Sequence, residues 1–363
     1  MKTVLVFFGG QSVEHDVSII TGVMTLNSVD KTKYFPLPVY VNKKGEWLYG
    51  KELYDIDGYK NLKQEKLKKV TLIGNIFYGI KGKKIYKIAE VSLAINCMHG
   101  ERGEDGSLSG YLSMCGVPLA SPDILSSSVA MDKAFTKKVA KALKVNALPY
   151  VAVTDASGLG EKIKDMEFPI IVKPNRLGSS IGINRAENIG ELESAINYAL
   201  RFGDTALLEP CLEDFIEINC SAYARADGSV RVSECERPVG RGKVLSFDDK
   251  YLSGKRVFPA DIEEKISKKI KEYTRKLYRE LGFSGVVRID YFVVNEKVYL
   301  NEINTVPGSL AYYLFCDTLK EFGDMLNELF EVALKGGALR SSFTTDYSTG
   351  ILCFTGGKSA KRL

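Results

Sequence analysis

An uninterrupted apolar run near the start of the chain, TVLVFFGG (3–10), most constrains the fold. A strand without polar alternation must be buried on both faces, which is typical of parallel sheets covered by helices. The two glycines that end the run indicate a tight turn, and we expect a helix over 14–28. Further strands at 35–41 and within 89–100, alternating with helices, predict a doubly wound α/β unit.

The rest of the chain divides into two more units. Pro and Ser in GVPLASPD (116–123) mark a linker, after which we expect one helix over 127–143. The third unit is predicted to be α+β, with a long amphipathic helix at 262–281 between strands. The expected units are 1–121, 122–208 and 209–340, followed by a tail, 341–363.

Composition excludes several classes of protein. The 50 basic and 45 acidic residues give a net charge of +5, and no basic-aromatic stripe indicates nucleic-acid binding. We interpret the lysine-rich stretch 60–69 as a solvated helix face. No run reaches the roughly 18 apolar residues of a membrane helix, and the five consecutive apolar residues VLVFF (4–8) fall short of the roughly 7–15 of a secretory signal core. Seven cysteines without a C-x-x-C pair argue against zinc or a disulfide framework. We therefore expect a cytoplasmic protein with neither a membrane nor a nucleic-acid partner.

Two strand-like segments carry a candidate metal site. VVRIDYF (286–292) and YLNEINT (299–305) form a predicted hairpin that brings Asp290 near Glu302 and Asn304. Strand alternation directs the latter two side chains to one face. Two carboxylates and an amide suit Mg²⁺, which prefers oxygen ligands. The alternative is a solvent-facing hairpin with a surface ion pair.

A glycine-rich turn and a hinge are candidates for nucleotide binding. In VKPNRLGSSIG (172–182), Lys173 ends a strand, and backbone N–H groups and serine hydroxyls follow that can bind phosphate. The segment is not a Walker A motif. In LLEPCLEDFIE (207–217), Glu209 and Glu217 flank a hinge that could bind adenine and ribose, with the Pro210 carbonyl as an acceptor and the Leu212 N–H as a donor. An ordinary interdomain loop is the alternative.

The only two histidines follow predicted strands. His15 lies in GGQSVEHDVS and His99 in CMHGERGEDGSL. Ligands bind at the carboxyl ends of parallel strands in sheets of this type, so both histidines are site candidates, although a single loop histidine is more often a surface residue. The first turn lacks the G-x-G-x-x-G pattern, which disfavours a nicotinamide dinucleotide.

Taken in order, the segments resemble the ATP-grasp family and, within it, the D-alanine–D-alanine ligases. The resemblance runs from residue 4 to about 335 and rests on FGGQSVEHDVS, HGERGEDGSLSG, MDK, VKPNRLGSSIG, FDDKYL, VVRIDYF and NEINTVPG. It implies a three-domain ATP-grasp fold, α/β and α+β, with an N-terminal doubly wound parallel-sheet domain. It also implies a homodimer, and MgATP held between two antiparallel sheets.

The resemblance further implies a reaction. ATP phosphorylates the carboxylate of a first D-amino acid, and the amine of a second attacks the acylphosphate, which gives a dipeptide, ADP and phosphate. The implied ligands of two Mg²⁺ ions, or of Mn²⁺, are Asp290, Glu302 and Asn304. The implied ATP-binding residues are Lys133, Lys173, Ser180, Glu209, Leu212, Glu217 and Lys250.

The remaining implied roles concern the amino acids. Glu14 binds the ammonium of the first substrate and His99 its carboxylate, and Glu14, Ser179 and Tyr251 form a hydrogen-bonded latch. Arg288 and the Gly308 N–H stabilise the tetrahedral oxyanion. The segment 244–256 would be a lid that excludes water from the acylphosphate.

The chain departs from the family pattern after the Pro-Gly corner. The family usually carries a Ser-His-Ser-Leu-like run whose second Ser binds the carboxylate of the second D-Ala, whereas this chain has SLAYYL (309–314). Tyr313 occupies the position of that Ser and Leu314 that of the Leu, and a phenol places its hydroxyl farther from the backbone. The acceptor is therefore D-Ala or another amino acid such as D-Ser. The Lys250–Tyr251 pair disfavours D-lactate, and a nucleotide-binding module without catalysis is the remaining alternative.

Overall fold

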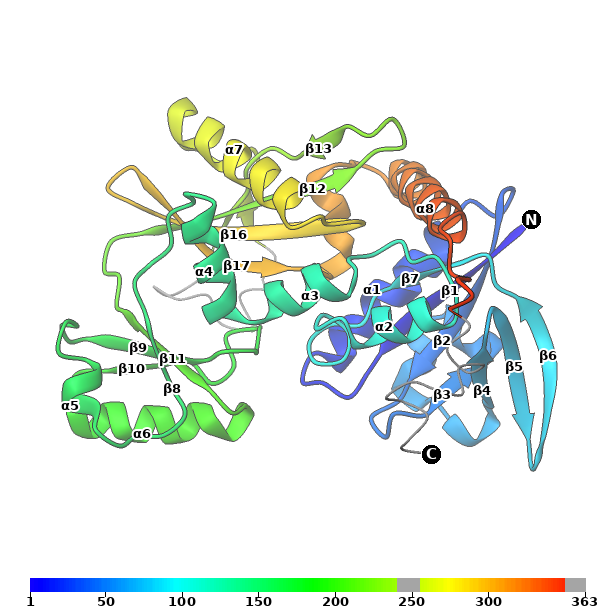
Figure 1. The fold of residues 1–363 in the computed structure, drawn as a ribbon, viewed down its shortest axis with the longest axis horizontal. Coiled ribbons are helices and arrows are strands. Elements are labelled where there is room, and N and C mark those ends of the chain that lie inside the picture. Colours follow the sequence, from blue (N-terminus) through cyan, green and yellow to red (C-terminus); the bar gives the residue numbers. More distant parts are fainter. Residues whose placement is uncertain (240–254, 350–363) are drawn as a thin grey trace.

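The computed structural model describes residues 1–239 and 255–349, which form three large sheets with helices on their faces (Figure 1). Among these residues, no helix combines the length and the apolar character needed to cross a membrane. Lys250 and Tyr251, and most of the expected lid, lie outside the described residues.

The first sheet has seven strands and is mixed rather than wholly parallel. Its strands in spatial order are β6 (Lys84–Glu90), β5 (Ile76–Lys81), β4 (Lys68–Ile73), β3 (Trp47–Tyr49), β2 (Tyr34–Val41), β1 (Lys2–Gly9) and β7 (Leu93–Asn96). Strands β2, β1 and β7 are parallel, and β3 to β6 extend them as an antiparallel meander. The parallel core was predicted; the meander was not, because its strands are short and partly polar.

The stretch 60–69 is not the helix face that its charge pattern suggested. It contains two short 3₁₀ helices, Asp57–Asn61 and Gln64–Lys66, and then enters β4. Most of its lysines are exposed, as expected, but their spacing does not repeat along an α-helix.

Strand β1 is buried on both faces, as its sequence predicts. Val4, Val6 and Phe8 belong to one apolar cluster, and Leu5 and Phe7 belong to another on the opposite face. Helix α1 (His15–Ser28) covers the first face, and α2 (Ser107–Met114) contributes to the second cluster. The expected helix over 14–28 is confirmed.

The other two large sheets are antiparallel and face each other across a gap in Figure 1. One consists of β10 (Asn184–Ala186), β9 (Ile170–Pro174), β11 (Ala206–Pro210) and β8 (Val151–Val153), with α5 (Leu159–Lys162) and α6 (Ile189–Ala199) on its outer side. The other consists of β13 (Val230–Val232), β12 (Ile216–Ala224), β16 (Val286–Val294) and β17 (Lys297–Asn304), covered by α7 (Glu264–Glu280). A short pair, β14 (Arg237–Pro238) and β15 (Arg256–Val257), lies beside β12.

The single helix expected over 127–143 is two helices. Helix α3 (Ile124–Met131) ends before Asp132, and α4 (Lys133–Ala142) begins after it. The Asp132 carboxylate accepts a hydrogen bond from the Phe135 N–H at 2.9 Å, so this residue caps α4 and separates the two helices. Both helices pack against β17.

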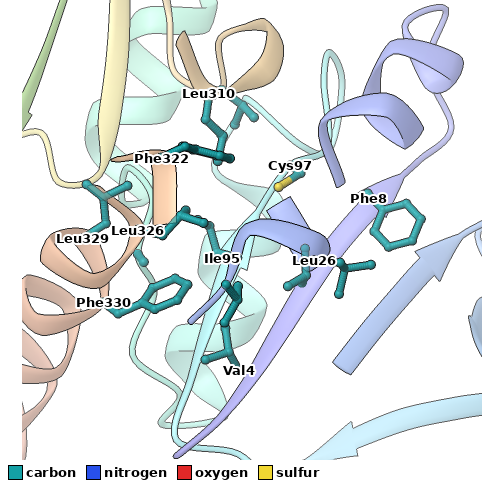
Figure 2. Packing of buried hydrophobic residues seen from close by; sticks show 14 of the residues in the cluster. Val4, Phe8, Leu26, Ile95, Cys97, Leu310, Phe322, Leu326, Leu329 and Phe330 are labelled. Atoms are coloured by element: carbon teal, nitrogen blue, oxygen red, sulfur yellow. The ribbon is translucent and has the colours of Figure 1, made fainter. Parts of the chain in front are cut away.

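A long helix that the sequence analysis did not predict, α8 (Leu319–Ser341), joins the last sheet to the first. Figure 2 shows Phe322 and Leu326 of α8 in one cluster with Val4 and Ile95 of the first sheet. Leu310, from the turn after β17, is buried in the same cluster and labelled there. The end of the predicted metal strand is thereby anchored in the core of the N-terminal unit.

Candidate active site

A cavity with about 770 Å³ of space, part of it open to solvent, lies between the two antiparallel sheets. Much of its wall is apolar, including Leu148, Ile171, Ile183 and Phe292, which suits a flat aromatic ring. The residues selected from sequence that line it are Lys133, Lys173, Ser180, Glu209, Leu212, Glu217 and Glu302.

Four charged side chains in this cavity form two ion pairs. Lys173 Nζ lies 2.8 Å from Glu209 Oε2 and 3.2 Å from Asn301 Oδ1. Lys133 Nζ lies 3.3 Å from Glu302 Oε2 and donates to the Leu177 carbonyl at 2.7 Å. These contacts link strands β9 and β11 to β17, so the two sheets meet through buried charge.

The hinge follows strand β11 directly. Glu209 and Pro210 end the strand, and Cys211 and Leu212 continue the cavity wall. The Cys211 N–H donates to the Pro169 carbonyl at 3.1 Å, which fixes the start of the hinge. Glu217, at the start of β12, lines the same cavity.

The candidate metal ligands come together because of strand register. Asp290 on β16 is directly opposite Glu302 on β17, and Asn304 Nδ2 donates to Asp290 Oδ2 at 3.0 Å. Arg288 makes a two-pronged contact with Asp290, from Nε at 2.7 Å and from Nη2 at 2.8 Å. Residues 1–239 and 255–349 contain no group of three or more His, Cys, Asp or Glu side chains arranged to hold a metal ion. The candidate metal ligands are instead two carboxylates and one amide oxygen, and these hard donors fit Mg²⁺ or Mn²⁺.

The glycine-rich loop touches the N-terminal unit. Ser179 and Ser180 adopt left-handed backbone angles, with φ of 55° and 57°. The Ser179 hydroxyl donates to Glu14 Oε1, and a Cβ added at Gly178 would lie 3.4 Å from the same oxygen. Two of the three expected latch residues are thus in contact, and the third, Tyr251, lies outside the described residues.

His99 is buried and held as a neutral imidazole. Its Nε2 lies 2.9 Å from Thr21 Oγ1. The same Thr21 oxygen accepts from the Ser309 N–H at 3.1 Å. Burial lowers the pKa of His99 to about 4. The imidazole can bind a substrate carboxylate only through a neutral hydrogen bond.

Glu104 is a candidate that the sequence analysis missed. Its carboxyl accepts from the Val306 N–H at 3.1 Å and from the Gly100 N–H at 3.2 Å, so it joins the histidine loop to the Pro-Gly corner. Burial and the nearby Glu14 carboxylate raise the pKa of Glu104 to about 8. The motif GERGEDG signalled an acid here, but spacing alone did not distinguish Glu104 from Glu101 and Asp105.

The other histidine holds the first turn in place. His15 Nδ1 lies 2.5 Å from the Gly10 carbonyl oxygen, and Nε2 lies 3.1 Å from the Tyr40 hydroxyl. Both ring nitrogens are engaged by protein groups. The structure therefore gives His15 a packing position, in contrast to its selection as a site candidate.

Tyr313, the residue expected to bind the second amino acid, lies beside two arginines. Arg288 Nη1 lies 3.4 Å from the Tyr313 hydroxyl. The Arg256 guanidinium lies 4.9 Å from the centre of the Tyr313 ring and 5.1 Å from that of Phe258, and it contacts Glu236 at 3.3 Å. Burial raises the pKa of the Tyr313 phenol, which stays protonated at neutral pH.

The Leu314 side chain is buried in the core, whereas Gly308 begins the turn that follows β17. The Leu314 side chain is 3% exposed and belongs to the apolar cluster shared with α8, so its side chain serves the core. Gly308 opens the turn 308–314, in which Ser309, Leu310 and Ala311 have φ between 48° and 53°. This left-handed turn is unusual for residues with a Cβ and directs Leu310 into the core.

Comparison with known proteins identifies relatives along most of the chain. The family model described as "D-ala D-ala ligase C-terminus" matches residues 139–334, and "D-ala D-ala ligase N-terminus" matches residues 3–122. The D-alanine–D-alanine ligase of Thermosipho melanesiensis is 33% identical, with 92% of this chain and 94% of that protein covered.

Two solved structures are similar over nearly the whole fold. The D-alanine–D-alanine ligase of Helicobacter pylori has a TM-score of 0.76 at 29% identity, covering 91% of this chain and 98% of that one. The VanG D-Ala:D-Ser ligase of Enterococcus faecalis has a TM-score of 0.78 at 26% identity, covering 92% and 99%.

Proposed function

The chain belongs to the D-alanine–D-alanine ligase family, and from this membership and the geometry of the site we propose how it works. It is an ATP-dependent ligase that joins two D-alanines for peptidoglycan precursor synthesis. The observation that carries the assignment of roles is the convergence of the selected lysines and glutamates on one cavity between two antiparallel sheets.

ATP occupies that cavity in the proposal. Adenine lies among the apolar side chains beside the hinge, with its amino group at the Pro210 carbonyl, the Leu212 N–H as a donor at its edge, and Glu209 facing it. Glu217 binds the ribose hydroxyls. Lys133, Lys173 and Ser180 face the phosphates, and Lys250 completes this set.

The metal ligands in the proposal are Asp290, Glu302 and Asn304, at the end of the cavity that Lys133 marks. Two Mg²⁺ ions, when bound, supply positive charge to the transferred phosphoryl group. In the described structure Lys133 contacts the Glu302 carboxylate and Arg288 contacts the Asp290 carboxylate. In the proposal, metal ions would bind these carboxylate oxygens in place of the two cationic side chains.

The chain's own residues prepare the amino acids. Glu14, held by Ser179, receives the ammonium of the first D-alanine, and neutral His99 donates to its carboxylate. Arg288 and the Gly308 N–H stabilise the oxyanion as the second amine attacks the acylphosphate. Water must be excluded from that acylphosphate, and we assign this to the segment that carries Tyr251.

The second amino acid is bound on the Tyr313 side. Because the Tyr313 hydroxyl lies beside Arg288, a phenol reaches the transfer site and can donate to the acceptor carboxylate. D-alanine is the proposed acceptor. D-Ser is the second candidate, because Tyr313 stands where the family usually has Ser and because a D-Ala:D-Ser ligase shares the fold.

Three further parts of the proposal concern organisation. We retain the units 1–121, 122–208 and 209–340 with a tail at 341–363, and the three large sheets support this division. We also propose that the protein is a homodimer and that it is located in the cytoplasm, where ATP is available.

Purified protein with MgATP and D-alanine tests the proposal through phosphate release and mass spectrometry of the product. A dipeptide of D-alanine is expected. If D-alanine alone gives no dipeptide, but phosphate is released when D-serine is added to D-alanine, D-serine would replace D-alanine as the proposed acceptor.

A further inference from the structure

A third buried lysine, Lys137, lies behind the nucleotide cavity. It follows Lys133 by one turn on α4, and its side chain is 2% exposed. It is not among the residues that line the cavity. Burying a lysine is costly unless its charge is paired, so its position needs a reason.

Lys137 shares Glu209 with Lys173. Lys137 Nζ lies 2.7 Å from Glu209 Oε1, and Lys173 Nζ lies 2.8 Å from Glu209 Oε2. The Glu209 side chain is 3% exposed, and both of its oxygens face ammonium groups. One carboxylate therefore balances two lysines, and the site holds an excess of positive charge.

The two lysines differ in what else they contact. Lys137 Nζ donates to the Leu148 carbonyl at 3.3 Å, a backbone group that does not move independently of the chain. Lys173 Nζ instead contacts the Asn301 side chain at 3.2 Å and lines the cavity. Lys137 is thus the fixed partner of Glu209, and Lys173 is the partner that can turn toward a ligand.

We propose that Lys137 is a positioning residue for the phosphates of ATP: it balances the buried Glu209 carboxylate, so that Lys173 can leave Glu209 and bind phosphate. The inference rests on the proposed nucleotide site. Without Lys137, a move of Lys173 toward phosphate would strand a buried carboxylate without a cation, which is strongly unfavourable. Lys173 would then stay on Glu209.

Binding measurements separate this role from a purely structural one. Lys137→Met keeps the length of the side chain and removes its charge, and Lys138→Met alters the exposed neighbour on the same helix as a matched control. Dissociation constants for ATP and adenosine are measured by competition against a fluorescent ATP analogue. We expect Lys137→Met to raise the dissociation constant for ATP by roughly tenfold to a hundredfold, as for a lost charge-assisted contact. The dissociation constant for adenosine should rise by less than about threefold. Lys138→Met should leave both unchanged.

A double variant provides the rescue. In Lys137→Met/Glu209→Gln the stranded carboxylate is gone, so Lys173 is free to bind phosphate. The ratio of adenosine to ATP dissociation constants should return to that of Glu209→Gln alone. Should Lys137→Met fail to fold, as judged by thermal unfolding, the ratio is compared between Lys137→Met/Glu209→Gln and Glu209→Gln alone.

Three results would overturn the inference. They are an unchanged ratio in Lys137→Met with both ligands bound as in the wild type, the same unchanged ratio with both ligands weakened equally, which would indicate a purely structural role, and a double variant whose ratio stays below that of Glu209→Gln. Failure of the wild-type protein to bind either ATP or adenosine would instead refute the nucleotide site, and the inference with it.

Discussion

On the proposed nucleotide side of the site, lysines contact carboxylates directly, whereas on the proposed acceptor side an arginine lies close to two aromatic rings. Lys173 contacts Glu209 across adjacent strands, and Lys133 contacts Glu302. Arg256 instead lies between Tyr313 and Phe258. The first arrangement is built from buried ion pairs, one between adjacent strands and one between helix α4 and strand β17, and the second depends on how a turn and its rings pack. A change of substrate is therefore easier to accommodate on the acceptor side.

The largest effect is expected on the nucleotide side, at Glu302. Glu302→Gln removes one charge of the proposed metal set and the partner of Lys133. We expect kcat to fall by about a thousandfold or more, a magnitude typical for loss of transition-state electrostatics, with an unchanged fold by circular dichroism. Glu296→Gln, in the exposed turn of the same hairpin, is the control and should retain full activity. Wild-type turnover in Glu302→Gln would refute the metal assignment.

Leu310→Ala tests whether core packing holds the acceptor side. Leu310 is 2% exposed in the cluster shared with Phe322, and its removal leaves a cavity. We expect the free energy of unfolding to fall by about 2–5 kcal/mol and the KM for the acceptor to rise more than that for ATP. Denaturant unfolding and initial rates measure both. An acceptor KM equal to that of the wild type would show that the turn is positioned by other contacts.

His99 predicts a pH dependence of stability. Its folded pKa of about 4 lies below the ordinary value of 6.5, so between these values the unfolded chain binds a proton that the folded chain does not. Stability from this group is complete above pH 6.5 and is lost as the pH falls toward 4, by up to about 3 kcal/mol. His99→Gln should flatten this part of the curve in urea titrations at pH 4 to 7. An unchanged slope would mean that His99 titrates normally.

The smallest effect is expected for the acceptor hydroxyl. Tyr313→Phe removes the group 3.4 Å from Arg288 and keeps the ring that packs on Arg256. The acceptor KM should rise roughly tenfold, the size of one hydrogen bond to a charged group, with the ATP KM unchanged. Tyr312→Phe is the matched neighbour and should have no such effect. A selective loss of ATP affinity in Tyr313→Phe would contradict the placement of Tyr313 on the acceptor side.

The first strand of the fold and much of the proposed nucleotide side could be predicted because their signals are local. A continuous apolar run identified β1, and a strand ending in Lys173 before a glycine loop identified one cavity wall. The hairpin spacing placed Asp290 opposite Glu302, since register follows from strand alternation. Each of these features lies within about a dozen residues.

The features that the sequence analysis missed depend on contacts across the fold. In the sequence, Lys137 is one of several lysines on an amphipathic helix. Its contact with Glu209 depends on tertiary packing. Glu104 is one of three acids in a short loop, and its backbone partner Val306 lies on a distant strand end. Asp132 separates α3 from α4 by capping, against a helical pattern that continues through it.

The most direct test of the ligase mechanism is the mass of the product formed by wild-type protein from MgATP and D-alanine. We expect D-alanyl-D-alanine, with one phosphate released for each dipeptide. Nucleotide binding without phosphate release, for D-alanine and for every other amino acid tested, would contradict it.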